Sequence, residues 1–186
     1  MRVIAGEKRH LILKTLSDLS IRPTTDKIKE TLFNMIQFNI EGKSFLDLFA
    51  GSGAIGIEAL SRRAKNAVFV DNNSAAIKVI KENLEHTKLM SSARVFKLDA
   101  SAAIDMLDKN DETFDIIFMD PPYNEKLYIG VLEKIKKSNV AVSDTIIIVE
   151  ANIKDDVKII ENIGYEVTRL KEYKTNKHIF LKLGAK

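Results

Sequence analysis

The 186-residue chain contains no cysteine. It can therefore form no disulfide and no thiolate metal site. Its three histidines, His10, His86 and His178, are scattered and lack the spacing of metal ligands. Each is predicted to be an exposed polar residue rather than a catalyst. We therefore expect no metal site in this protein.

Long apolar runs are also missing. No segment reaches the roughly 18 consecutive apolar residues that mark a membrane-spanning helix. Residues 1–9 lack the apolar stretch of a signal peptide. We therefore expect a soluble cytoplasmic protein with no membrane partner.

Hydrophobic residues make up 45% of the chain, which is enough for a sizeable core. The length predicts one domain, residues 1–186.

Charge is unevenly distributed along the chain. The net charge is +3, with seven basic and three acidic residues in 1–29 and six basic and two acidic residues in 165–186. Both ends are thus basic and the middle is acidic. Basic ends are typical of contact with phosphate groups. A Lys-rich sequence with solvated side chains would show the same pattern, so charge alone leaves both interpretations open.

Strand-like apolar runs alternate with helical patterns from residue 44 onward. Strands are predicted near 44–48, 67–71, 94–98, 114–119 and 145–150, with helices near 53–63, 74–88, 100–108, 127–137 and 155–163. Two last runs, 165–170 and 179–183, predict an antiparallel C-terminal hairpin. The alternation predicts an α/β fold, a doubly wound and mostly parallel seven-stranded sheet of Rossmann-like type.

The N-terminal segment is predicted to differ from this core. Apolar runs within residues 2–14 flank a charged stretch and predict a small β-hairpin, so residues 1–22 read as a basic hairpin extension and 23–186 as the catalytic core. A helix should open at residues 23–26, where threonine and aspartate suit a helix N-terminus. Its apolar stripe is predicted to be Ile28, Leu32, Met35 and Ile36.

The chain has only three prolines, and two are adjacent in Asp120-Pro121-Pro122-Tyr123, directly after the apolar run 116–119. Proline supplies no N–H, so this turn offers only backbone acceptors between a carboxylate and an aromatic ring. The combination suits a flat heterocycle with an exocyclic amine. Asp120 and the Pro121 carbonyl would accept the amine hydrogens, and the base would stack on Tyr123. A plain loop is the alternative.

A glycine-rich turn supplies the second motif. Residues 51–56 match G-x-G-x-x-G between a predicted strand and a helix, a context typical of nucleotide-like ligands. Asp47, just before the glycines, would repel a pyrophosphate at the helix N-terminus. S-adenosylmethionine (SAM) carries a sulfonium and an ammonium group and no phosphate, so the acid favours SAM as the ligand.

Two further acids end predicted strands. Asp71 is predicted to accept hydrogen bonds from the ribose hydroxyls, with helix capping as the alternative. Asp99 would accept from the adenine amino group, and capping of the following helix is again the alternative. The predicted cofactor-binding residues are Asp47, Phe49, Gly51, Gly53, Asp71, Asn72, Asp99 and Ala100.

Together, the glycine turn and the Asp-Pro-Pro-Tyr turn resemble class I SAM-dependent methyltransferases that act on exocyclic amines. With residues 22–34 and 56–62 added, nearly the whole chain closely resembles the bacterial RsmD family. That resemblance implies methylation of guanine N2 in 16S ribosomal RNA, a guanine of the 966 type, within the small ribosomal subunit. It implies Asp120, Pro121, Pro122 and Tyr123 as catalytic residues. The predicted RNA-binding residues are Arg2, Lys8, Arg9, Lys14, Arg22, Thr24 and Thr25.

Family members usually carry a more basic first hairpin, where this chain has His10 and Leu11. We expect a monomer.

Three other functions stay open at this point. An adenine-N6 or cytosine-N4 methyltransferase would share both motifs, and a nicotinamide oxidoreductase would share the glycine turn. A non-enzymatic RNA-binding module would account for the basic ends.

Overall fold

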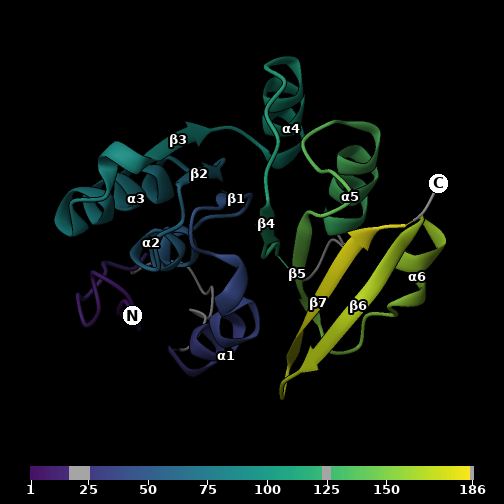
Figure 1. The fold of residues 1–186 in the computed structure, drawn as a ribbon, viewed down its shortest axis with the longest axis horizontal. Coiled ribbons are helices and arrows are strands. Elements are labelled where there is room, and N and C mark those ends of the chain that lie inside the picture. Colours follow the sequence, from purple (N-terminus) through teal and green to yellow (C-terminus); the bar gives the residue numbers. More distant parts are fainter. Residues whose placement is uncertain (17–25, 123–126, 185–186) are drawn as a thin grey trace.

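Figure 1 shows the computed structural model of the chain, which describes residues 1–16, 26–122 and 127–184. A seven-stranded sheet runs through its centre in the spatial order β3-β2-β1-β4-β5-β7-β6. The strands are β1 (Ser44–Asp47), β2 (Asn66–Asp71), β3 (Ala93–Lys97), β4 (Ile116–Met119), β5 (Ile146–Asn152), β6 (Tyr165–Glu172) and β7 (Asn176–Leu183). The helices are α1 (Asp26–Ile36), α2 (Ala54–Ser61), α3 (Ser74–Thr87), α4 (Ala100–Lys109), α5 (Leu127–Lys137) and α6 (Lys158–Asn162), with 3-10 turns η1 (Gln37–Asn39) and η2 (Met90–Ser92).

Strand β1 marks the point where the winding of the sheet reverses. It pairs in parallel with β2 on one side and with β4 on the other. Ligands of open α/β sheets bind at the carboxyl ends of the strands beside such a switch point. At the other end of the sheet, β7 is antiparallel to both β5 and β6, which confirms the predicted C-terminal hairpin.

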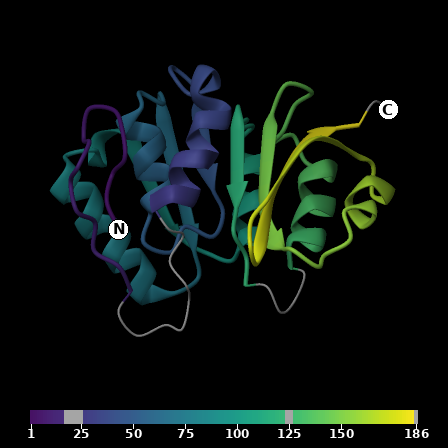
Figure 2. The same cartoon turned by 90° about the horizontal axis from the view of Figure 1, so that it is seen from below.

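Helices cover both faces of the sheet (Figures 1 and 2), with α1, α2 and α3 on one face and α4, α5 and α6 on the other. Neighbouring side chains of a strand point to opposite faces. Phe118 of β4 accordingly packs in the same apolar cluster as Ile57 of α2, and the preceding Ile117 packs with Ile104 of α4. The predicted doubly wound α/β fold is therefore confirmed.

Element boundaries lie close to the predicted ones, with α6 as the main exception. A helix was expected over 155–163, and only Lys158–Asn162 is helical. The Asp156 side chain accepts a hydrogen bond from the Lys158 N–H at 3.0 Å, so a local turn occupies the expected first turn. Within the described part of the chain, no helix is long and apolar enough to cross a membrane.

The N-terminal segment folds back on itself with less strand pairing than predicted. One antiparallel bridge, between Arg2 and Ile12, replaces the expected two-stranded ladder. The Ile4 and Ala5 N–H groups instead donate to the carboxylate of Glu58 on α2, at 2.8 and 3.0 Å. The segment is therefore a loop fastened to a helix. We call residues 1–14 the N-terminal loop; its predicted end at residue 22 lies outside the described residues.

Helix α1 buries a different stripe from the one predicted. Leu32 and Ile36 are buried as expected, whereas Ile28 and Met35 are only partly buried. The fully buried residues also include Phe33 and Lys29, which were not part of the predicted stripe. Burial of a lysine is tolerated because its ammonium group bonds Glu58 at 3.2 Å and the Arg2 carbonyl at 2.6 Å.

Candidate active site

The structure brings the two predicted motif acids to the same edge of the sheet. Asp47 is the last residue of β1, and Asp120 directly follows β4. The two strands are neighbours, with Asp47 in register with Phe118. The charge of Asp47 acts on Asp120 and helps to raise the pKa of that carboxyl. The turns that follow β1 and β4 therefore meet at the switch point.

The glycine turn has the backbone shape that its sequence predicts. Gly51 and Gly53 adopt φ angles of 54° and 78°, which side chains disfavour. A Cβ added to Gly51 would meet nothing within 4 Å, so this stretch of backbone is open to a ligand. A Cβ on Gly56 would lie 2.3 Å from the Phe69 ring, so the third glycine permits close packing of α2 on β2.

Asp47 is buried without a full set of partners. Its Oδ2 accepts from the Gly56 N–H at 3.1 Å, and its side chain is 1% exposed. Its Oδ1 is buried and has no hydrogen-bond partner among the described residues. Burial, with a smaller contribution from Asp71, raises the pKa of Asp47 to about 7, against the effect of the Gly56 hydrogen bond. A buried acceptor of this kind suits a cationic ligand.

Of the two roles considered for Asp71, helix capping falls to its neighbour Asn73. The Asp71 carboxylate accepts from the Gly51 N–H and the Asn73 N–H, both at 2.9 Å. The N-cap of α3 is Asn73, whose side chain accepts from the Ala75 N–H. Asp71 therefore holds the glycine turn in place rather than capping the helix. Asn72 is exposed between them.

At the third strand end the capping alternative is observed. Asp99 is the N-cap of α4, and its Oδ1 accepts from the Ala102 N–H at 3.0 Å. Ala100, the first residue of α4, is buried. Phe49 is partly buried against the apolar cluster beneath α4 and α5. These residues shape this edge of the sheet.

Asp120 lies at the start of the Asp-Pro-Pro turn. Burial contributes most to raising the pKa of Asp120 well above its usual value, followed by the charges of Glu150 and Asp47. Pro121 is buried and Pro122 is exposed. Tyr123, predicted to stack on the base, lies outside the described residues.

A buried polar group behind Asp120 was not predicted. Glu150 on β5 is 3% exposed, and its carboxylate bonds the Nε2 atom of His178 at 3.1 Å and the side-chain amide of Asn176. The Nδ1 atom of His178 lies 3.2 Å from the Tyr173 hydroxyl. The prediction that His178 is exposed is wrong, whereas His10 and His86 are exposed as expected. A glutamate within the apolar run of β5 was the signal available in the sequence.

The predicted RNA-binding residues occupy different settings. Arg2 pairs with Asp26 at 3.0 Å, and Lys14 pairs with Glu82 at 2.8 Å. Arg9 is exposed and forms no ion pair with any described residue. Of the remainder, Lys8 is partly buried near the tip of the N-terminal loop, and Arg22, Thr24 and Thr25 lie outside the described residues.

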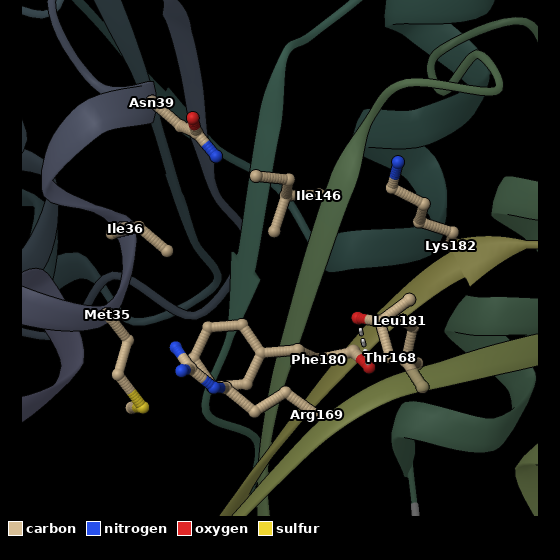
Figure 3. A pocket seen from close by; sticks show the side chains of 9 residues that line it. All are labelled: Met35, Ile36, Asn39, Ile146, Thr168, Arg169, Phe180, Leu181 and Lys182. Atoms are coloured by element: carbon tan, nitrogen blue, oxygen red, sulfur yellow. Dashed lines mark hydrogen bonds between the residues drawn. The ribbon is translucent and has the colours of Figure 1, made fainter.

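Two hollows lie away from the paired acids. One, with a volume of about 370 Å³, lies between the N-terminal loop and α1. Arg2, Arg9 and Lys27 are among the residues that line it. The other, of about 210 Å³, lies between α1 and the C-terminal hairpin. Figure 3 shows Met35 and Phe180 on its two sides. The second hollow contains none of the predicted site residues.

Comparison with known proteins places the chain among methyltransferases. The family described as Conserved hypothetical protein 95 matches residues 1–182. YlbH of Bacillus subtilis is 41% identical over 172 residues, which are 92% of each protein. Ribosomal RNA small subunit methyltransferase D of Escherichia coli is 33% identical over 155 residues, covering 83% of this chain and 76% of that protein.

Solved structures share the fold. Escherichia coli yhhF aligns with a TM-score of 0.84 and 29% identity over 100% of this chain and 99% of that chain. SMU.776, solved with S-adenosylhomocysteine (SAH), aligns with a TM-score of 0.70 and 17% identity over 83% of this chain and 49% of that chain. The fold and the acids at its switch point define a Rossmann-like methyltransferase. More narrowly, the chain belongs to the Conserved hypothetical protein 95 family, the RsmD-type ribosomal RNA methyltransferases.

Proposed function

We propose that this protein transfers a methyl group from SAM to the N2 amine of a guanine in 16S ribosomal RNA. The observation that carries the proposal is the meeting of Asp47, with its unpartnered buried oxygen, and Asp120 at one switch point. The names of the relatives support ribosomal RNA of the small subunit as the substrate class. Guanine N2 rests on the resemblance to the RsmD family, and we propose action as a monomer on the small subunit.

The residues at the glycine turn fit SAM. The ligand carries two cationic groups, and Asp47 offers a buried carboxylate oxygen with no other partner among the described residues. The open backbone at Gly51 allows close approach, and Asp71 fixes that turn through the Gly51 N–H. We assign the cationic end of SAM to Asp47, the ribose to Asp71 and Asn72, and the adenine edge to Asp99 and Ala100.

When bound, SAM supplies an electrophilic methyl group on its sulfonium. The Asp120 carboxylate and the Pro121 carbonyl accept the two amine hydrogens of the target base, which localises the nitrogen lone pair and aims it at the methyl carbon. The N–C bond forms as the S–C bond breaks, and the nitrogen releases a proton. Tyr123 is assigned to stack on the base, a contact of about 1–3 kcal/mol. Positioning should supply most of the rate enhancement.

Asp120 accepts an amine hydrogen most strongly when its carboxyl group is ionised. Its raised pKa disfavours that state in the free protein. A cation bound beside Asp47 would favour the ionised form because opposite charges lower a carboxyl pKa. Binding of SAM would thereby prepare Asp120 for the base.

The proposal is tested by transfer of labelled methyl from SAM to small ribosomal subunits that lack the modification, followed by nucleoside analysis. We expect N2-methylguanosine. Asp120→Ala should keep SAM affinity and lower transfer by at least about 100-fold, the usual effect of losing a positioned acid or base. Asp144→Ala, which removes an exposed acid, is the matched control.

Two results would contradict this assignment. Near-normal turnover by Asp120→Ala would exclude the amine-binding role of the Asp-Pro-Pro turn. SAM binding without label in the RNA would retain the cofactor and reject the substrate, so that DNA and other RNAs would be assayed next.

A further inference from the structure

Three polar side chains lie in a row across the sheet at the candidate active site. Phe118 of β4, Ile148 of β5 and Phe180 of β7 are paired in register. Asp120 lies two positions after Phe118. Glu150 lies two positions after Ile148 and pairs in register with His178. Residues two apart on a strand share a face. Beside the apolar row, an aspartate, a glutamate and a histidine thus form a second row on the same face of the sheet.

Glu150 is fixed as a hydrogen-bond acceptor. Its Oε1 accepts from the Asn176 side-chain amide, and its Oε2 lies 3.1 Å from Nε2 of His178. The charge of this hydrogen-bonded carboxylate acts on Asp120 and helps to raise the pKa of Asp120.

The histidine in this row is oriented by Tyr173. The Tyr173 hydroxyl lies 3.2 Å from Nδ1 of His178, and burial raises the pKa of Tyr173 to about 12. A protonated phenol donates to Nδ1, which leaves the hydrogen of a neutral imidazole on Nε2 and directs it at Glu150. The two rings also meet edge to face, with centroids 5.1 Å apart. Tyr173 and His178 thus hold Glu150 as a hydrogen-bonded chain.

We infer that Glu150, held by His178 and Asn176, is a positioning residue that keeps Asp120 basic enough to take the proton released during methyl transfer. This inference rests on the proposed function. A fixed carboxylate disfavours a second negative charge nearby and so makes the neighbouring carboxylate a stronger base. General bases work best when their pKa lies near the working pH.

The proton balance of the step is simple. The amine nitrogen forms a bond to the methyl carbon, and the sulfonium departs as a neutral thioether in SAH. The nitrogen, now positively charged, loses one proton to the Asp120 carboxylate. Asp120 then releases that proton to solvent when the product leaves. Glu150 keeps its hydrogen bonds to Asn176 and His178 and takes no part in the transfer of the proton.

Other charged groups near Asp120 bear on its titration. Asp47 faces it from β1, and Asp71 of β2 acts in turn on Asp47. Behind Glu150 lie His178 and Tyr173, and the Lys171 ammonium lies 6.0 Å from the centre of the Tyr173 ring. Of the two acids whose charges act directly on Asp120, Glu150 is the one with both carboxylate oxygens hydrogen-bonded, whereas Oδ1 of Asp47 has no partner among the described residues.

Glu150→Gln is the test variant because it removes the charge and keeps the shape. The glutamine oxygen can still accept from Asn176. His178 can accept from the new amide by moving its hydrogen to Nδ1, which then donates to the Tyr173 oxygen. The fold should therefore survive, and melting temperature checks it. Glu166→Gln, on the exposed side of β6, removes the same charge elsewhere and is the control.

The first readout does not depend on activity. Carbon-13 NMR of the Asp120 carboxyl gives its pKa in each protein, and we expect Glu150→Gln to lower it by about one unit or more. The second readout is the pH profile of single-turnover methyl transfer. Its acidic limb should move to lower pH, and the plateau rate should fall by about 10-fold or more as the base weakens. The dissociation constant for SAM should change less than the rate does.

The outcomes separate this inference from the proposed function. A wild-type protein that methylates no RNA refutes the proposed function, while the NMR titration still decides whether Glu150 sets the pKa of Asp120. An unchanged Asp120 pKa in Glu150→Gln overturns the inference, even if the wild type is fully active. A lowered pKa with an unchanged rate profile also overturns it, because Asp120 would then not be the proton acceptor.

Discussion

Lys29 and Glu58, buried beneath the N-terminal loop, form an ion pair of 3.2 Å, and Arg62 bonds the same carboxylate at 2.8 Å. Asp47, equally buried at the end of β1, has no lysine or arginine partner among the described residues. Both regions take charge out of water, which is costly unless a counter-charge or hydrogen bonds are supplied. The Glu58 region contains its own counter-charges, whereas the buried Asp47 carboxyl is open to a cationic ligand.

This difference separates a structural cluster from a ligand site. Around Glu58, every carboxylate oxygen has a donor within the protein, from Lys29, Arg62 and two backbone N–H groups. Such a cluster has no carboxylate oxygen free to bind a ligand. At the switch point, burial and the charge of Asp71 raise the pKa of Asp47. Burial and the charges of Glu150 and Asp47 raise the pKa of Asp120, as expected of a site that binds a cation.

The largest effect should come from breaking the compensated cluster. Glu58→Ala leaves Lys29 as an unpaired buried cation and strips two backbone N–H groups of their acceptor. Removal of one partner of a buried pair typically costs about 3–5 kcal/mol of unfolding free energy. We expect a loss of that size in urea denaturation.

Glu85→Ala, at an exposed position of α3, is the matched control and should lie within about 0.5 kcal/mol of the wild type. Equal stability of the two variants would mean that the Lys29–Glu58 cluster does not fasten the N-terminal loop. The Glu58 region would then not be a structural cluster, and it would no longer contrast with the Asp47 region.

The uncompensated region should respond in the opposite direction. The raised pKa of Asp47 means that the folded protein binds a proton that the unfolded chain releases, so stability falls as pH rises from about 4 to about 7. Asp47→Asn removes this dependence. The variant should match the wild type near pH 4 and exceed it above pH 7, by up to about 4 kcal/mol.

The same substitution should weaken SAM binding by at least about tenfold, because it removes the charge assigned to the cationic ligand. Urea denaturation at pH 4.5 and 8 measures the first effect, and calorimetry with SAM measures the second. A variant that is less stable at pH 8, or that binds SAM normally, would show that Asp47 has a structural role.

Periodicity predicted the fold well because each strand and helix carries its own local pattern. The run 116–119 is apolar throughout and forms β4, and the glycines after β1 adopt the positive φ angles that the turn needs. The N-terminal loop shows the limit of this reasoning. Its two apolar runs predicted a β-hairpin, but the Ile4 and Ala5 N–H groups bond Glu58, more than 50 positions away.

The candidate site follows the same rule. Asp47 and Asp120 could be found because each adjoins a motif with a recognisable turn. Glu150 left only the signal of a glutamate within an apolar run, and both Glu150 and His178 were missed because their burial depends on pairing between β5 and β7, which no local pattern encodes. A charged residue is buried only where the fold brings a partner, and that partner was distant in the sequence.

The smallest effect should come from the exposed pair between Arg2 and Asp26, which tests whether the N-terminal loop can contact RNA. The guanidinium lies 3.0 Å from the Asp26 carboxylate, the Arg2 side chain is exposed and the Asp26 side chain is partly exposed. A double-mutant cycle should give a coupling of about 0.2–1 kcal/mol that decreases in high salt. So weak a pair leaves Arg2 available to a phosphate, unlike the cations around Glu58. A coupling above about 2 kcal/mol would place the pair with the buried cluster and remove Arg2 from the proposed RNA surface.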